Sequence, residues 1–417
     1  MTAAGRSATA QSILAAMNAS SGEPGFERPL RVGMVAGETS GDQLGAALIA
    51  ALRERVPQLQ CFGVAGPKMC AAGCEAWAGA EELAVMGLAE VLHHLPRLLR
   101  LRAALRRRFL AARADVFIGI DAPEFHLGLA ARLHRGGLKT VQYVSPQVWA
   151  WRQGRVRRIG RACDLVLCLL PFETAFYAEH GVRAVFVGHP LADQIPLDVD
   201  RGAARRSLGI APSETVIALL PGSRVGEIER LGRDFIGAAA WLSERRPGWR
   251  FLAPMATARA REVFQRKRSE AIDVPEITVL DGQAQQVLAA CDGAIVASGT
   301  ATLETLLSRR PMVVAYRLGA LTAFLLRRLR LVKVPYFSQP NLLVGRALVP
   351  ELVQEAVSAE ALGAALLGRL SDEPYRAELA AEFDRVHRQL RRGGAARAAQ
   401  AIIQCVRGAT VSEESGR

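Results

Sequence analysis

One acidic side chain stands where a parallel α/β sheet presents groups to a ligand. Asp121 comes directly after the apolar run 116–120 and is followed by Ala122 and Pro123. A carboxylate at the carboxyl end of a strand can take a proton from an attacking hydroxyl group, which would make Asp121 a general base. An aspartate just before a proline also suits the N-cap of a helix, so both interpretations stay open.

A second stretch is suited to phosphate. Ser298, Gly299 and Thr300 follow the apolar run 294–297 and open a helical pattern, with Glu304 one turn further along. The N–H groups and positive end of such a helix can bind a pyrophosphate, and Glu304 on the same side could accept both hydroxyls of a ribose. An ordinary capped helix, with the glutamate supporting the cap, would explain the same residues.

A tight turn with an arginine follows another apolar run, residues 216–220. Gly222 and Ser223 predict a turn with exposed N–H groups, and Arg224 adds a planar cation that suits phosphate oxygens. The alternative is an ordinary strand-to-helix turn with a surface arginine.

A glycine-bounded loop, residues 37–42, lies between a strand pattern and a helix pattern. Its Glu38, Ser40 and Asp42 could hold a sugar or its phosphate, or Ser40 or Asp42 could only cap the helix. The loop is not GxGxxG, and no GxxxxGK[ST] occurs in the chain. NAD binding and nucleotide-driven phosphoryl transfer therefore lack their usual sequence support.

Alternating strands and helices are needed to bring these candidate residues to one edge of a sheet. Strands are expected at residues 30–36, 60–64, 115–120, 139–144, 164–169 and 184–187, and after a linker at 191–200 again at 216–220, 250–254, 278–280, 294–297 and 312–316. Helical patterns separate them, and the strands are apolar on both faces. This pattern predicts an α/β fold with mostly parallel sheets covered on both sides.

The order of the elements also predicts how the chain divides. We expect a disordered leader at 1–28, one Rossmann-like domain at 29–195 that faces the acceptor and membrane, and a second at 196–375 that binds the nucleotide. Helices at 376–405 would pack back across the domains, and 406–417 would form a disordered tail.

Composition narrows the class of protein. The 417 residues carry 53 Lys and Arg against 40 Asp and Glu, a net charge of +13, which suits a phosphate-bearing partner or an anionic membrane. The seven cysteines form no CxxC pair, so we expect reduced thiols and no metal site. The first 28 residues lack the features of a secretory signal. No run of about 18 apolar residues predicts a membrane-spanning helix.

An arginine-rich amphipathic region covers residues 86–113, and residues 321–333 form a similar patch. Pro96 is expected to break or bend the first of these helices. Such a helix can lie among anionic headgroups, or it can be a core helix with a solvated basic face. No aromatic interleaving supports nucleic-acid binding. The candidate membrane contacts are Met86, Leu88, Leu95, Arg97, Leu99 and Arg100.

An ordered set of motifs resembles the bacterial lipid-A-disaccharide synthase family, from about residue 30 to about residue 390. The matching blocks are VAGETSGD at 35–42, FGVAGP at 62–67, ELAVMG at 82–87, GIDAP at 119–123, YVSPQVWAWR at 143–152, VGHP at 187–190, LPGSR at 220–224, ASGTA at 297–301 and PNLL at 340–343.

The resemblance implies the GT-B architecture, with two Rossmann-like parallel-sheet domains facing across a cleft. It implies a UDP-2,3-diacylglucosamine donor, a 2,3-diacylglucosamine 1-phosphate acceptor, and β(1→6) linkage with inversion. It implies no metal and no cofactor, and a cytoplasmic enzyme held peripherally on the inner face of the inner membrane. It also allows a homodimer with exchanged C-terminal parts.

The same resemblance assigns roles to single residues. Asp121 matches the proposed base and Arg224 the arginine on the pyrophosphate, while Asn341 matches a polar residue of the donor site. The residues that match the nucleotide-binding loop and helix are Ser298, Gly299, Thr300 and Glu304. Three positions depart from the family pattern, namely Thr39, Glu124 and Gln339, and Gln339 adjoins the donor site.

Two other functions stay open on the sequence alone. One is a different UDP-sugar enzyme on the same architecture, such as a UDP-N-acetylglucosamine epimerase, which would need no lipid. The other is a catalytically silent peripheral membrane protein, which would lose nothing when Asp121 is changed.

Overall fold

Two parallel β-sheets form the framework of the protein. We describe them on a computed structural model, in which residues 26, 28–83, 88–150, 153–319 and 334–408 are described. All pairings between the described strands are parallel, so each connection must return from the carboxyl end of one strand to the amino end of the next. The expected α/β class is therefore what the chain adopts.

The first sheet has seven strands in the order β3-β2-β1-β4-β5-β6-β7. They are β1 (Leu30–Ala36), β2 (Leu59–Ala65), β3 (Cys74–Gly79), β4 (Val116–Ile120), β5 (Lys139–Tyr143), β6 (Leu165–Cys168) and β7 (Ala184–Phe186). The helical segments between them are α2 (Glu38–Arg55), α3 (Pro67–Ala71), η1 (Ala80–Leu83), α4 (Leu88–Ala111), α5 (Pro123–His134), η2 (Gln153–Arg155), α6 (Val156–Gly160) and α7 (Phe172–Ala178).

The second sheet has six strands in the order β10-β9-β8-β11-β12-β13. They are β8 (Val216–Leu220), β9 (Arg250–Met255), β10 (Ile277–Asp281), β11 (Gly293–Ala297), β12 (Met312–Tyr316) and β13 (Glu351–Val353). The helical segments from the first crossing onward are α8 (Pro190–Gln194), α9 (Arg201–Ser207), α10 (Val225–Arg245), α11 (Ala258–Ser269), α12 (Ala284–Ala290), α13 (Thr300–Leu307), α15 (Gln339–Val344), η3 (Gln354–Ala356), α16 (Ala359–Ser371) and α17 (Glu373–Leu390), and the chain ends in α18 (Gly394–Val406), which returns to the first sheet.

Each sheet is buried on both faces because alternate residues of its strands point to opposite sides. On β1, Val32 and Met34 belong to one apolar cluster and Val35 to another. On β8, Ala218 and Ile217 divide in the same way between two clusters. The continuous apolar runs of the sequence thus become central strands.

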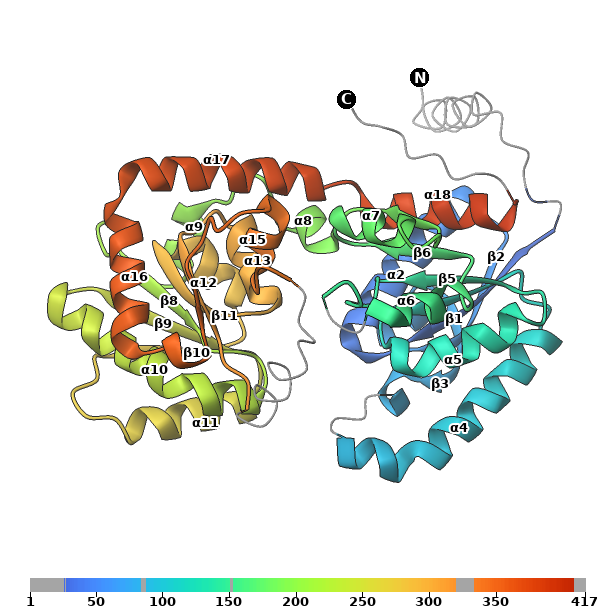
Figure 1. Ribbon diagram of the computed structural model, residues 1–417, viewed down its shortest axis with the longest axis horizontal. Helices are drawn as coiled ribbons and strands as arrows, with labels where there is room; N and C mark the ends of the chain where they lie inside the picture. The colour runs from blue at the N-terminus through green and yellow to red at the C-terminus, as the bar shows by residue number, and fades with distance from the viewer. Residues whose placement is uncertain (1–25, 27, 84–87, 151–152, 320–333, 409–417) are drawn as a thin grey trace, which may run out of the picture.

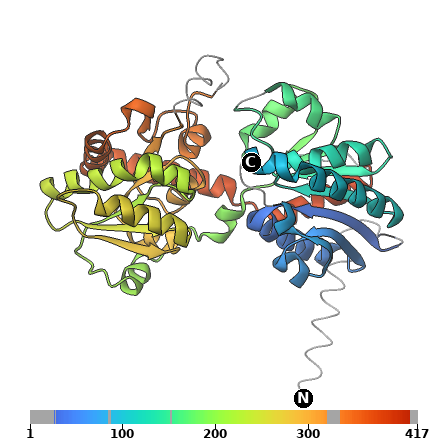
Figure 2. The same ribbon diagram turned by 90° about the horizontal axis from the view of Figure 1, so that it is seen from below.

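The two sheets belong to separate halves that lie side by side, as Figures 1 and 2 show. In Figure 1, α17 runs along the second half and α18 continues along the first. Ala398, Ala399 and Ile402 of α18 join the core of the first sheet, where the helix packs on α2. The end of the described chain therefore completes the half that begins it.

The chain crosses between the halves at two segments that hold each other. Asp193 of α8 accepts hydrogen bonds from the N–H groups of Gly393 and Gly394, at 2.9 and 2.7 Å. The N–H of His189 donates a hydrogen bond to the carbonyl of Leu390 at 2.9 Å. These bonds tie the first crossing to the return crossing.

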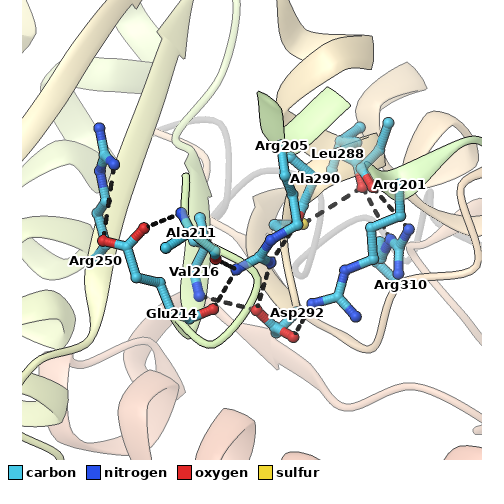
Figure 3. Close-up of polar contacts among 12 residues, drawn as sticks. Arg201, Arg205, Ala211, Glu214, Val216, Arg250, Leu288, Ala290, Asp292 and Arg310 are labelled. Atoms are coloured by element: carbon cyan, nitrogen blue, oxygen red, sulfur yellow. Dashed lines mark hydrogen bonds and ion pairs between the residues drawn. The ribbon is translucent and has the colours of Figure 1, made fainter. Parts of the chain in front are cut away.

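A cluster of arginines fastens α9 to the second sheet (Figure 3). Asp292, just before β11, accepts hydrogen bonds from Arg201 and Arg205 and from the N–H of Val216. Arg205 is buried and also donates to the carbonyl of Ala290 at 2.9 Å. The cluster lies at the amino ends of β8 and β11, opposite the edge where ligands bind in such sheets, so we assign it a structural role.

Candidate active site

Asp121, the residue directly after β4, has an unusual backbone conformation. Its φ is 54° and that of Ala122 is 34°, so two successive non-glycine residues are left-handed. The N–H of Asp121 donates to the carbonyl of Tyr143 at 3.0 Å, which ties the turn to the neighbouring β5. Ala122, without a side-chain cap, is the N-cap of α5, so the alternative role of Asp121 as that N-cap is not observed. Such strain persists where the surroundings enforce it, as at functional sites.

Ser40 lies beside Asp121. Its hydroxyl donates a hydrogen bond to the Oδ2 atom of Asp121 at 3.1 Å. The loops that carry them are in contact, because a Cβ added to Gly37 would lie only 2.6 Å from the Cβ of Ala122. Helix α2 already begins at Glu38, so the expected loop 37–42 is mostly helical, and the side chain of Glu38 lies outside the described residues.

Asp42 has a structural role. Its carboxylate is 3% exposed and accepts hydrogen bonds from the N–H groups of Gly66, Lys68 and Met69 at 2.9 to 3.0 Å. It therefore caps the short helix α3 rather than its own helix. Because these bonds occupy the carboxylate, Asp42 influences a ligand only through the position of the loop.

The segment after β5 borders the Asp121 turn, and its Trp149 contacts a buried acid of α7 that the sequence analysis missed. Val144 is left-handed, with φ 72°, which is rare for a β-branched residue. Glu173 is buried and accepts hydrogen bonds from Trp149 Nε1 and the N–H of Leu170, both at 3.0 Å. Burial raises the pKa of Glu173 to about 7. The sequence carried one signal for this contact, because a glutamate three residues after Leu170 can accept the N–H of Leu170.

Helix α13, which follows β11 of the second sheet, has an exposed N-terminus. Its N-cap is Gly299, and no side chain caps the helix. Gly299 and Thr300 are exposed, and a Cβ added to Gly299 would meet nothing within 4 Å. Burial raises the pKa of Glu304 one turn further on. The capped helix that the sequence also allowed is therefore not observed, and these residues leave room for an anion.

The turn before α10 differs from the expectation of free N–H groups. The Glu227 carboxylate accepts hydrogen bonds from the N–H of Ser223 at 3.0 Å and of Arg224 at 3.3 Å. Gly222 has φ 126°, and a Cβ there would lie 2.5 Å from Glu227. The glycine thus makes room for Glu227, a cap that the Gly-Ser-Arg motif did not reveal. The Arg224 side chain is 80% exposed and pairs with Glu227 at 3.6 Å, so one face of its guanidinium stays open to a ligand.

Asn341 also differs from the expectation, because it is fully engaged inside the protein. Its Nδ2 group donates to Val349 O at 2.9 Å and to Glu351 at 2.7 Å, and its Oδ1 atom accepts from two N–H groups at 2.8 Å. Glu351 also accepts from the Ser338 hydroxyl at 2.6 Å. The network fixes the segment beside α13, since Ser298 Oγ donates to the carbonyl of Phe337 at 2.7 Å.

Helix α4 combines a core face with an exposed face. It continues through Pro96, and Figure 1 shows that it changes direction along its length. Leu105 and Phe109 are buried, whereas Leu99 is 46% exposed. Arg97 pairs with Glu82 at 3.0 Å, and Arg100 is exposed. Met86, residues 321–333 and the side chains of Leu88 and Leu95 lie outside the described residues.

Two properties of the described residues concern membranes and metals. None of the helices in the described ranges is long and apolar enough to cross a membrane. Across those same ranges, no group of three or more His, Cys, Asp or Glu is placed to hold a metal ion. All seven cysteines lie in the described ranges without a disulfide bond between them, and six of the seven are buried.

Comparison with known sequences decides the family. The model of the family described as Lipid-A-disaccharide synthetase matches residues 32–406. The chain belongs to the lipid-A-disaccharide synthase family. A relative named lipid-A-disaccharide synthase from Pseudomonas aeruginosa (strain UCBPP-PA14) is 53% identical over 377 residues, which cover 90% of this chain and 98% of the relative. One from Sodalis glossinidius (strain morsitans) is 52% identical over 379 residues, covering 91% and 99%.

Solved structures agree with the expected fold. A UDP-GlcNAc 2-epimerase from Neisseria meningitidis, bound to UDP-GlcNAc, covers 91% of this chain and all of its own, with a TM-score of 0.61 at 11% identity. CalG4, the calicheamicin glycosyltransferase, covers 90% and 98%, with a TM-score of 0.55 at 16% identity. These likenesses show that this member of the lipid-A-disaccharide synthase family has the GT-B fold.

Family membership makes the chain a glycosyltransferase of lipid A biosynthesis. The epimerase alternative has only the fold-level likeness at 11% identity, against 53% for the family relative. The alternative of a catalytically silent protein has no such support, since the family relatives reported above are named as a synthase.

Proposed function

We propose that this glycosyltransferase moves 2,3-diacylglucosamine from UDP to the 6-hydroxyl of 2,3-diacylglucosamine 1-phosphate. The observation that carries the proposal is the Asp121 carboxylate, held at the carboxyl end of β4 with the Ser40 hydroxyl 3.1 Å away. A carboxylate in this place can act as a general base on an acceptor hydroxyl.

The proposed reaction is one displacement. The acceptor oxygen bonds to the anomeric carbon while its proton passes to Asp121. The bond from that carbon to the β-phosphate oxygen breaks, and UDP leaves with the electron pair. A single displacement inverts the anomeric centre and gives the β(1→6) disaccharide 1-phosphate.

The leaving UDP needs positive charge at its phosphates. The exposed guanidinium of Arg224 and the uncapped N-terminus of α13 supply it from two neighbouring strands, β8 and β11. The proposal therefore uses no metal and no cofactor. Burial of Glu304 within α13 suits a hydrogen bond to the ribose hydroxyls.

Both substrates carry acyl chains, which leave a bilayer only at high cost. We infer that the enzyme works peripherally on the cytoplasmic face of the inner membrane. The exposed Leu99, with Arg97 and Arg100 on the same helix, supports contact with anionic headgroups. Each basic residue near such a surface adds about 1 kcal/mol to binding.

A disaccharide assay tests the proposal. Purified protein is mixed with both substrates in detergent and chelator, and UDP and disaccharide are measured. We expect turnover that Asp121→Ala lowers by roughly 10²–10⁴-fold, while Asp198→Ala, at a fully exposed acid, retains it. Turnover of soluble UDP-N-acetylglucosamine without lipid, and none with the acylated substrates, would favour the epimerase reaction instead.

A further inference from the structure

A buried histidine contacts the backbone of the Asp121 turn. His126 lies in α5, is 0% exposed, and its Nε2 atom is hydrogen-bonded to the carbonyl oxygen of Asp121. A carbonyl oxygen only accepts, so Nε2 carries the hydrogen and donates it. The contact spans the start of the helix and reaches the residue that carries the proposed base.

The imidazole occupies a space that the strand beneath leaves for it. A Cβ added to Gly119 of β4 would lie 2.4 Å from His126 Nδ1. The ring therefore rests on the strand two residues before Asp121, and any larger residue at 119 would displace it. Strand, histidine and turn form one packed unit.

The ring is neutral over the range in which enzymes work. Burial, with a further contribution from the charge of Arg102, lowers the pKa of His126 to about 3. Its Nδ1 atom has no hydrogen-bond partner among the described residues. A neutral Nε2–H tautomer keeps one constant donor on the Asp121 carbonyl as pH changes.

The turn needs such a constraint. Asp121 and Ala122 are both left-handed, a conformation that non-glycine residues avoid when the surroundings do not enforce it. The direction of the Asp121 carbonyl and that of its side chain depend on the same φ angle. A donor that holds the carbonyl therefore also restricts the position of Cβ, from which the carboxylate reaches Ser40.

We propose that His126 is a positioning residue, which holds the left-handed Asp121 turn and thereby aims the carboxylate at the acceptor hydroxyl. The inference rests on the proposed function, in which Asp121 is the base. It adds a second contact that aligns the base: His126 of α5 holds the main-chain carbonyl of Asp121, and Ser40 holds its carboxylate.

Three variants test it. His126→Leu removes the donor, and we expect kcat to fall roughly 10- to 100-fold while KM for both substrates stays unchanged, since misplacement of a catalytic group costs about this much. His126→Gln keeps an N–H near the position of Nε2 and should recover most of kcat. His387→Leu is the matched control, because His387 is also buried and its Nε2 contacts the Ala192 carbonyl at 3.1 Å.

The outcomes separate alignment from stability. A merely structural role would lower the melting temperature of both leucine variants alike and leave kcat of each near wild type, which would overturn the inference. A rise of KM in His126→Leu with kcat unchanged would overturn it too. If Asp121→Ala itself retains turnover, the proposed base is wrong, which is a different failure.

A spectroscopic measurement on the wild-type protein is independent of activity and of variant folding. Nitrogen-15 NMR of labelled histidine, with the His126 signal assigned by its absence from His126→Gln, should show the His126 ring with hydrogen on Nε2 and none on Nδ1, unchanged between about pH 5 and 9. His126→Gln should remove this signal. A His126 ring that titrates near its ordinary value, or that carries its hydrogen on Nδ1, would contradict the proposed contact.

Discussion

The Ser40 hydroxyl and the Asp121 carboxylate, which come from α2 and from the end of β4, are joined by a hydrogen bond of 3.1 Å. The two residues are far apart in sequence, and the parallel pairing of β1 with β4 brings them to one edge of the sheet. A hydroxyl that donates to one oxygen leaves the other oxygen of Asp121 for a proton.

Ser40→Ala should therefore slow catalysis. We expect kcat to fall about tenfold, because the carboxylate loses one constraint on its direction. The disaccharide assay measures it, with Thr39→Ala as control, since Thr39 is the exposed neighbour. Equal effects of the two substitutions would argue against an aligning role for Ser40.

Arg224→Ala should weaken the binding of UDP. Loss of a charge-assisted hydrogen bond predicts a dissociation constant higher by about 10- to 100-fold. Titration calorimetry with UDP checks this, with Arg233→Ala, an exposed arginine on the same helix α10, as the control. Unchanged affinity in Arg224→Ala would remove this residue from the donor site.

The exposed face of α4 should govern binding to membranes. Reversal of both Arg97 and Arg100 to Glu is expected to weaken binding to anionic vesicles by about 30-fold or more, at about 1 kcal/mol for each basic residue lost. Wild-type binding should fall as salt rises. Ile272→Glu is the control, since Ile272 is 87% exposed on the other half. Vesicle binding that changes neither with salt nor with charge reversal would disprove the assignment of α4 to membrane contact.

Glu173 should make stability depend on pH. Its pKa in the folded protein, about 7, lies above the ordinary 4.5, so the folded state holds the proton more tightly. The protonated Glu173 therefore stabilises the folded state fully below about pH 4.5. This stabilisation is lost as pH rises to about 7, a change of about 3 kcal/mol in the free energy of unfolding. Denaturation at several pH values measures it. The loss should disappear in Glu173→Gln and persist in Glu179→Gln, at an exposed acid.

Asp42→Ala should act on stability rather than on substrate. Three N–H groups would lose their acceptor, which predicts a loss of at least about 2 kcal/mol in the free energy of unfolding. Urea denaturation measures the loss. A raised KM with unchanged stability would instead restore Asp42 as a ligand of the acceptor.

The sequence was most informative where physical signals are local. The central strands were predictable because they are long apolar runs, as in β1 and β4. Strand β3 was missed because most of its residues are partly exposed at the sheet edge, and β13 because it has only three residues. Motifs located the strand ends that carry Asp121, Arg224 and Thr300.

The partners of those residues were not predictable, because they depend on contacts between distant segments. Nothing in the motif around Gly222 shows that Glu227 will take its N–H groups. The Asn341 side chain looked available to a donor, yet Glu351 and Val349 occupy it. The left-handed turn at Asp121 and its contact with His126 likewise require the packed fold.

Helix α18 has a consequence for biosynthesis. Ala398, Ala399 and Ile402 fill the core against the first sheet, although the whole second half precedes them in the chain. A nascent chain leaving the ribosome must therefore keep one apolar side of its first half uncovered until α18 is made. At about 5–20 residues per second, the delay is of the order of 10 s. During this interval the unfinished first half is a natural client for chaperones.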